Sequence, residues 1–327
     1  MTEFDLIARY FTRPFAADGL VACGIGDDCA LLDSGENMLA VTTDLLVEGR
    51  HFAPSVDAAS LGHKALAVNL SDLAAAGASP RCFFLALALP RADSAWLAGF
   101  SHGMFALADA HGCVLAGGDT TRSPAASPGD GPICVCITAI GEVPRSMIRT
   151  RAGARVGDDI WVSDRLGGAA LALAHRNGVT DELTPIEAGA CATRLNRPEP
   201  RIPLGVALRG IATACIDVSD GLLGDLGHIL SRSQCGARIH WKDLPRQPGL
   251  SAQPADLHAR CLLAGGDDYE LLFTAAADRR ERVQAAATAA GVPVTRIGAI
   301  TDGRDLVVLD GQGLPMDTPF KAYDHFG

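Results

Sequence analysis

The sequence predicts an α+β protein of two domains. At 327 residues the chain is longer than one ordinary hydrophobic core requires, which favours two domains. Strand patterns alternate with two long apolar helix patterns in the first half, and this mixture is typical of an α+β layout. A stretch rich in Pro, Gly and Arg follows at Pro144 to Ala154, so we expect domains at residues 1–145 and 146–327.

The patterns of the first half predict a mixed sheet with helices. They indicate helices at residues 3–16, 58–76 and 92–111 and strands at residues 29–32, 38–44, 81–89, 114–119 and 133–141. Gly77 is expected to end the second helix. The turn at residues 33–37 makes the first two strands a hairpin, which would return Asp44 to the side of Asp27 and Asp28.

The second half continues with strands and shorter helices. We expect strands at residues 159–163, 212–217 and 271–274, a helix that begins at Gly167, and mixed loop and helix over residues 178–199. Another helix is expected directly after Asp217-Val-Ser-Asp-Gly221. The second half therefore forms its own α+β domain.

Composition and charge narrow the function classes. A hydrophobic content of 48% and a mean hydropathy of +0.18 are typical of a well-packed globular protein. The net charge of −10 argues against nonspecific nucleic-acid binding, and it makes an anionic substrate hard to hold without cations. We see no apolar run long enough to span a bilayer, no signal-peptide pattern and no Cys-x-x-Cys pair. A cytoplasmic protein with reduced cysteines is therefore expected.

Carboxylates at turns are the main chemical signal. Gly24-Ile-Gly-Asp-Asp28 places two adjacent acids at a tight turn, where like charges require a cation or strong hydrogen bonds nearby. A plain surface turn is the alternative. Further acids recur at strand ends and on a helix face, at Asp44, Asp72, Asp119, Asp217, Asp220 and Asp267. Oxygen-only clusters of this kind suit Mg²⁺.

Several of these residues have structural alternatives. Thr42 and Thr43 add oxygens beside Asp44, although threonine is also simply common in strands. Asp72 lies on an apolar helix face, where either a metal ion or an N–H network would satisfy it. Ser219 or Asp220 would bind a ligand or cap the following helix. A lone histidine such as His51 is most often structural.

This chain would have to bind phosphate groups without the usual sequence motifs. It has no P-loop and no protein-kinase signature, so phosphates would be held by metals, arginines and backbone amides. Gly117-Gly-Asp119 could let a ligand approach the main chain closely.

Together, the motifs resemble the thiamine-monophosphate kinase family, in the same order from end to end. They are Gly24-Ile-Gly-Asp-Asp28, Thr42-Thr-Asp44, Asn69-Leu-Ser-Asp-Leu73, Gly117-Gly-Asp-Thr120, Asp217-Val-Ser-Asp-Gly221, Gly265-Gly-Asp-Asp-Tyr-Glu270 and Tyr323-Asp-His-Phe326. The resemblance implies a two-domain fold like aminoimidazole ribonucleotide synthetase and a homodimer joined through the N-terminal sheets. It also implies the conversion of ATP and thiamine phosphate to ADP and thiamine diphosphate.

The resemblance also implies roles for individual residues. Those similar to the family's Mg²⁺ ligands are Asp28, Thr42, Thr43, Asp44, Asp72, Asp119, Asp217 and Asp220. Those similar to its ATP contacts are Gly118, Asp119, Arg151 and Ser219. His51, Asp267 and Tyr323 are similar to its substrate contacts, although Asp267 stands where the family usually has Glu. No covalent nucleophile or general base is expected, because a phosphate monoester with a second pKa near ~6 is already ionised at neutral pH.

Two alternatives remain open. One is another ATP-using enzyme of the same superfamily, of the aminoimidazole ribonucleotide synthetase or selenophosphate synthetase type. The latter would need a reactive Cys or selenocysteine in a glycine-rich N-terminal segment, which Cys23 and Cys29 do not provide. The other is a non-enzymatic module that binds divalent cations, although EF-hand spacing is absent.

Overall fold

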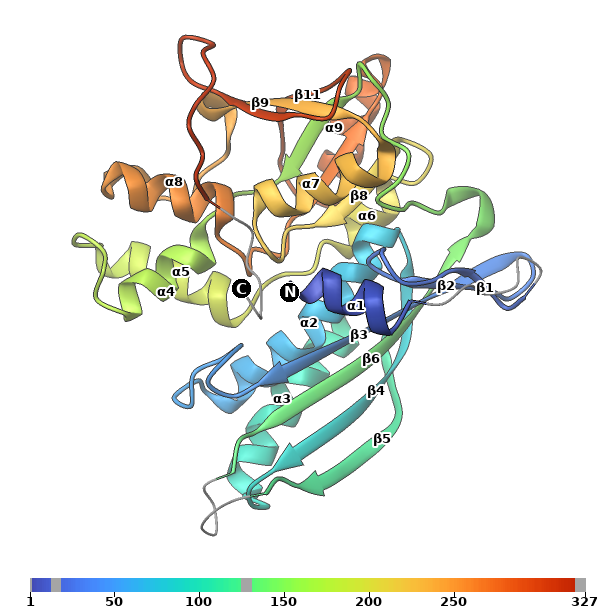
Figure 1. Ribbon diagram of the computed structural model, residues 1–327. Coiled ribbons are helices and arrows are strands. Elements are labelled where there is room, and N and C mark those ends of the chain that lie inside the picture. Colours follow the sequence, from blue (N-terminus) through green and yellow to red (C-terminus); the bar gives the residue numbers. More distant parts are fainter. Residues whose placement is uncertain (1, 13–18, 125–130, 321–327) are drawn as a thin grey trace.

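The computed structural model of the chain describes residues 2–12, 19–124 and 131–320 (Figure 1). Two six-stranded sheets lie in the two halves of the chain, and helices pack against both. The predicted α+β class and the N-terminal mixed sheet are confirmed. None of the helices in the described ranges is long and apolar enough to cross a membrane.

The N-terminal sheet has the strand order β1-β2-β3-β6-β4-β5, in which only the β4–β5 pair is parallel. Its elements are α1 (Glu3–Tyr10), β1 (Val21–Cys23), β2 (Ala30–Asp33), β3 (Asn37–Val47), α2 (Ala58–Ala76), β4 (Ser79–Leu89), α3 (Ser94–Ala110), β5 (Val114–Arg122) and β6 (Cys134–Pro144). The predicted hairpin of β2 and β3 is present, with Ala30 opposite Val41.

The C-terminal sheet has the order β12-β9-β11-β7-β10-β8, in which only β12 and β9 are parallel. Its elements are β7 (Asp159–Ser163), α4 (Gly168–Arg176), α5 (Pro185–Asn196), α6 (Ile202–Ala207), β8 (Ala212–Asp217), α7 (Leu222–Ser233), β9 (Gly236–His240), α8 (Ala255–Ala264), β10 (Leu271–Ala275), α9 (Arg280–Ala290), β11 (Val294–Thr301) and β12 (Leu306–Leu309).

Helix α2 is the central element of the molecule. It packs against α3, β3 and β6 in the N-terminal half and against α6 and β8 in the C-terminal half. The side chain of Asp57 accepts a hydrogen bond from the Ser60 amide at its start, and Gly77 ends it at a φ of +71°. Both helix ends are where the sequence predicts them. Because nearly every residue of α2 is buried, its polar residues must find partners inside the protein.

Two glycines allow α2 and α3 to pack closely. A Cβ at Gly62 would lie 2.0 Å from the carbonyl oxygen of Phe100, and a Cβ at Gly103 would lie 1.9 Å from that of Ala59. The two backbones therefore touch, and the pair forms a rigid layer on one face of the N-terminal sheet (Figure 1).

The opposite face of the N-terminal sheet carries apolar side chains that are exposed in the single chain. Leu45 is 54% exposed on β3 and Phe84 is 41% exposed on β4. These residues alternate with buried neighbours, as expected for strands that are covered on one face only.

Some expected boundaries moved for local reasons. The first helix ends at Tyr10, and its predicted continuation enters residues 13–18, outside the described ranges. The third helix begins at Ser94, because the carboxylate of Asp93 accepts hydrogen bonds from the amides of Ala95 and Trp96 and so caps it. Strands β3 and β5 both run three residues beyond the predicted ends.

Candidate metal and nucleotide site

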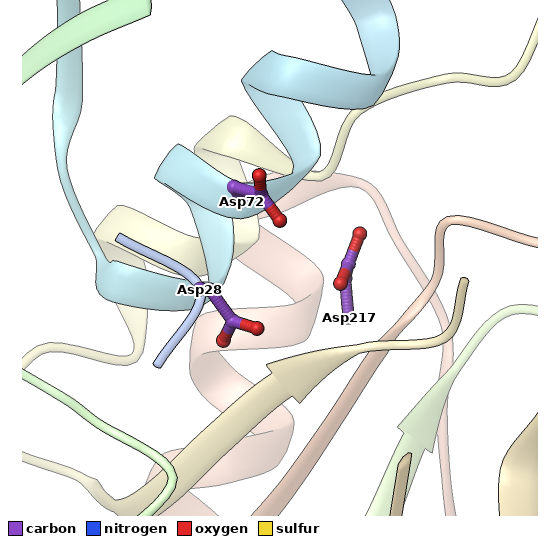
Figure 2. A group of neighbouring side chains, drawn as sticks. All are labelled: Asp28, Asp72 and Asp217. Carbon is purple, nitrogen blue, oxygen red and sulfur yellow. The ribbon is translucent and has the colours of Figure 1, made fainter. Parts of the chain in front are cut away.

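Three carboxylates converge between the two domains. Asp28 precedes β2, Asp72 lies in the last part of α2, and Asp217 ends β8. One oxygen of each lies within 4.8 Å of the others, and Figure 2 shows the three carboxylates directed toward a common point. Three segments that are distant in the sequence thus deliver one oxygen-rich site, as the motifs predict.

The site has an excess of negative charge. Burial, followed by the charge of Asp28, raises the pKa of Asp217 from 3.8 to about 8. Burial and then the charge of Asp44 raise the pKa of Asp72 well above its ordinary value. A buried carboxylate that resists ionisation gains most from a cation, and oxygen-only donors match the preference of Mg²⁺. The donor set therefore fits a hard divalent cation.

Three further acids, Asp44, Asp220 and Asp27, border the three converging carboxylates. Burial and the neighbouring charge of Asp220 raise the pKa of Asp44 to about 6, so these two carboxylates face the same region. Partial burial and then the charge of Asp28 raise the pKa of Asp27 to about 6. Asp44 and Asp220 therefore extend the acidic region beyond the first three carboxylates.

Hydroxyl and amide groups fix the orientation of the acids. The Thr42 hydroxyl donates a hydrogen bond to Asp72, and the Ser71 hydroxyl donates one of 2.6 Å to Oδ2 of Asp217. The side-chain oxygen of Asn69 accepts a 3.2 Å hydrogen bond from the amide of Asp44. The roles of Ser71 and Asn69 were not predicted, although both lie in the Asn69-Leu-Ser-Asp-Leu73 motif.

Arg151 forms an ion pair with this acidic cluster through Asp28. Its guanidinium donates to Oδ1 of Asp28 at 2.6 and 3.0 Å, and its backbone amide donates to both oxygens of Asp27 at 3.2 Å. Arg151 lies between β6 of the N-terminal sheet and β7 of the C-terminal sheet, and it thus connects the Gly-Asp-Asp turn to the C-terminal half. A guanidinium here suits an anionic ligand as well as the two acids.

Asp225, which was not predicted as a functional residue, caps helix α7. The N-cap position of this helix is Gly221, which has no side chain that could cap it. Instead, Oδ2 of Asp225 accepts hydrogen bonds from the amides of Asp220 and Gly221 at 3.2 and 3.0 Å. The capping carboxylate that the structure places at the start of this helix is therefore that of Asp225.

Of the predicted substrate residues, His51 and Asp267 lie within the described ranges. His51 is half-buried four residues beyond β3, and its Nδ1 accepts a 2.9 Å hydrogen bond from the Val47 amide. Asp267 lies next to the loop that carries Ser219, because its amide donates to the Ser219 carbonyl at 2.8 Å. Tyr323 falls within residues 321–327, outside the described ranges.

Three predicted residues do not join the cluster within one chain. Thr43 is exposed, and its hydroxyl lies 2.9 Å from that of Thr138 on the open face of the sheet. Gly118 and Asp119 are exposed on β5, three strands away from β3. A Cβ at Gly118 would lie 1.8 Å from the carbonyl oxygen of Leu85, so close pairing with β4 already requires glycine there.

A separate cavity of ≈ 550 Å³ lies beyond the end of β3. It is lined by residues that include Glu48, Pro54 and Trp96, and none of the predicted site residues in the described part of the chain lines it. The acidic cluster, rather than this cavity, is where the chemical groups of the sequence motifs gather.

Comparison with known proteins agrees with this geometry. Residues 26–143 match the family model of the AIR synthase related protein N-terminal domain, and residues 155–311 match that of the C-terminal domain. The chain is 44% identical to "Thiamine-monophosphate kinase" of Salmonella typhimurium, over 99% of this chain and 98% of the relative.

Two solved structures are similar over nearly the whole chain. The thiamine-monophosphate kinase of Stenotrophomonas maltophilia K279a is 44% identical, with a TM-score of 0.79 over 96% of this chain and 98% of that one. The structure described as AaThiL complexed with AMPPCP and TMP is 28% identical, with a TM-score of 0.81 over 99% and 97% of the two chains.

Proposed function

Because the chain belongs to the thiamine-monophosphate kinase family, we infer that it transfers a phosphoryl group from ATP to thiamine phosphate, giving thiamine diphosphate and ADP. The observation that carries this function is the convergence of Asp28, Asp72 and Asp217 between the two domains. The reaction joins two anions, and a buried set of oxygen ligands is what such a reaction requires in a chain without a P-loop.

We propose that several Mg²⁺ ions are held by Asp28, Asp72 and Asp217 together with Asp44 and Asp220. Bound there, Mg²⁺ would neutralise the phosphate charges and align the two substrates for in-line transfer. Thr42, Ser71 and Asn69 support this role, because they fix the carboxylates and the strand that carries them.

Arg151 and Ser219 are proposed to contact ATP. Arg151 places a guanidinium beside Asp28, and Ser219 lies in the turn between β8 and α7, where backbone amides favour anions. His51 and Asp267 are proposed to contact thiamine phosphate, and Tyr323 is proposed to do so from the C-terminal segment.

We propose direct transfer without a phospho-enzyme and without a general base. The phosphate oxygen of thiamine phosphate is ionised above its second pKa of ~6, so it is nucleophilic without proton removal. The Val47 amide donates a hydrogen bond to Nδ1 of His51 and so fixes the imidazole ring. A ring held in this way supports a role in binding the substrate.

A homodimer joined through the open faces of the N-terminal sheets is also proposed. Leu45 and Phe84 lie on that face and are exposed in the single chain, which is typical of an association surface. Asp119 shares this face by register with Ala86, Cys136 and Leu45. Three interstrand steps of ~4.8 Å separate Asp119 from β3, which is too far for Asp119 to join the acidic cluster of its own chain. We therefore propose that Thr43, Gly118 and Asp119 complete a site together with the partner protomer.

The cytoplasm is the proposed location. All ten cysteines are free thiols, and six of them are buried. A reducing compartment is where buried free thiols are usual.

A phosphotransfer assay tests the function. Purified protein, thiamine phosphate and ATP with Mg²⁺ should yield thiamine diphosphate and ADP in equal amounts, and removal of Mg²⁺ with EDTA should stop the reaction. Aminoimidazole precursors and selenide serve as competing substrates. ATP consumption with one of those, and none with thiamine phosphate, would favour another enzyme of the superfamily. No nucleotide binding in calorimetry would favour a cation-binding module.

A further inference from the structure

Lys64 is a buried cation that the proposed chemistry does not use. It is one of three lysines in the chain, and its side chain is only 4% exposed. Lys64, Val68 and Asp72 follow one another at four-residue spacing on α2, so they share a face of the helix. Eight residues at a 1.5 Å rise place Lys64 about 12 Å from Asp72 along that face. Lys64 therefore lies about two helical turns before Asp72 on α2.

The partner of this ammonium group is Asp267, from the other domain. Nζ of Lys64 lies 3.1 Å from Oδ2 of Asp267, and within the described residues this is the only ion pair of Lys64. Burying an ammonium group is costly unless a carboxylate compensates it. The two partners are unequal, because the side chain of Asp267 is 34% exposed. The cation is enclosed, whereas the carboxylate remains open to a ligand.

Further contacts hold Asp267 in one position. The Tyr269 hydroxyl donates a 2.9 Å hydrogen bond to Oδ1 of Asp267, so each carboxylate oxygen has a fixed neighbour. Asp267 and Tyr269 both have positive φ values, +65° and +51°, which are uncommon for residues other than glycine. Their amides donate to the carbonyls of Ser219 and Val218, both at 2.8 Å, and so fasten this backbone to the turn after β8. Strained backbone that is held this firmly is typical of a functional position.

The pairing determines what this carboxylate can recognise. Lys64 already balances its charge, so Asp267 offers hydrogen-bond acceptors more than net attraction for a cation. Each carboxylate oxygen can accept more than one hydrogen bond, so both keep capacity for a ligand. An N–H donor on an uncharged ring matches this arrangement. In thiamine phosphate that group is the amino group of the aminopyrimidine ring.

We propose that Lys64 is a positioning residue that holds Asp267 oriented to accept a hydrogen bond from the aminopyrimidine amino group. The inference rests on thiamine phosphate being the substrate. The Lys64–Asp267 pair then selects the ring of the substrate, and the acidic cluster serves the phosphates. The pair also joins the two domains across the site, because Lys64 belongs to α2 and Asp267 to the loop before β10.

Steady-state kinetics of four proteins test the proposal. They are the wild type, Lys64→Met, Asp267→Asn and the double variant. Lys64→Met should raise the KM for thiamine phosphate about tenfold or more and change the KM for ATP less than about threefold. Because Lys64 acts through Asp267, the double variant should be no worse than Asp267→Asn alone. Lys242→Met, at an exposed lysine, is the matched control and should behave as wild type.

A substrate analogue separates positioning from a general structural effect. In oxythiamine phosphate the pyrimidine amino group is replaced by oxygen. The wild type should prefer thiamine phosphate over this analogue, and Lys64→Met should lose most of that preference. Lys64→Gln provides a second variant if Lys64→Met does not fold, and thermal melting reports folding.

Three results would overturn the inference. Additive effects in the double variant would mean that Lys64 contacts the substrate directly. An unchanged preference between the two substrates, or equal increases in both KM values, would mean that Lys64 only supports packing. Absence of thiamine phosphate turnover by the wild type would instead refute the proposed function, so the two failures are distinguishable.

Discussion

The hydroxyl of Ser71, on α2, donates a 2.6 Å hydrogen bond to the carboxylate of Asp217, at the end of β8. The two residues are 146 positions apart and belong to different halves of the chain. Both are buried, so water cannot replace the bond. It therefore links the helix that carries Asp72 to the strand that carries Asp217, and it sets how two candidate metal ligands face each other.

Ser71→Ala should weaken metal binding more than it weakens the fold. Loss of a group that orients a metal ligand usually costs 10- to 100-fold in affinity, so we expect about a tenfold or greater rise in the Mg²⁺ concentration for half-maximal activity. Mg²⁺ titration of the phosphotransfer rate measures it. Ser60→Ala, on the same helix but outside the cluster, is the matched control. Equal Mg²⁺ requirements in both variants would show that the bond has only a structural role.

The sequence motifs were sufficient to predict the centre of this site. Asp28, Asp72 and Asp217 each follow a local pattern, and the structure brings all three together. The fold class was equally accessible, because the hairpin of β2 and β3 and the caps of α2 depend on neighbouring residues. These predictions succeeded because the information for each is local.

The supporting residues could not be read in the same way. Ser71 and Lys64 are ordinary polar residues on an apolar helix until residues 217 and 267 are placed against them. Asp225 resembles an acid in the first turn of a helix, yet it takes over the capping that Ser219 and Asp220 were candidates for. Gly118 looked like an opening for a ligand, whereas the approach of β4 already requires it. Each of these roles depends on tertiary contacts.

Asp44→Asn and Asp72→Asn should each abolish turnover and leave the fold intact. Both carboxylates face the acidic region, and an amide cannot replace the charge that a divalent cation requires. Burial and neighbouring acids raise the pKa of both groups, so neutral side chains there should not destabilise the metal-free protein. Circular dichroism and thermal melting check the fold. Near-normal activity of either variant at low Mg²⁺ would contradict the cluster assignment.

The metal-free protein should become less stable as the pH rises from 6.5 to 8. The folded-state pKa of Asp217 is about 8 against an ordinary 3.8, so in this range the folded state binds more protons than the unfolded state. Stability therefore falls with rising pH, by an amount on the order of 1–2 kcal/mol for one such buried group. Histidines contribute little above their ordinary pKa of about 6.5.

Thermal melting in EDTA at several pH values measures this effect. Added Mg²⁺ binds the ionised acids, so it should raise the melting temperature more at pH 8 than at pH 6.5. Asp217→Asn should reduce the pH dependence, and Asp72 should account for part of what remains. The opposite sign, with the metal-free protein more stable at pH 8, would mean that the cluster is already neutralised by groups within the protein.

Mixed dimers test whether Asp119 acts in the site of the partner protomer. Asp119→Asn and Asp72→Asn should each be inactive as pure proteins. When equal amounts of the two variants are mixed and exchange subunits, half of the dimers contain one chain of each variant. If Asp119 serves the site of the partner, each of these mixed dimers has one intact site. Activity should then return to about one-quarter of the wild-type value, as the symmetry of a two-fold dimer requires. A mixture that stays inactive, with exchange verified by mass spectrometry, would place Asp119 in the site of its own chain or outside the reaction.

Phe84→Glu supplies an independent control, because a charge on the open face should prevent dimerisation, and a monomer should lose activity even with every acid intact.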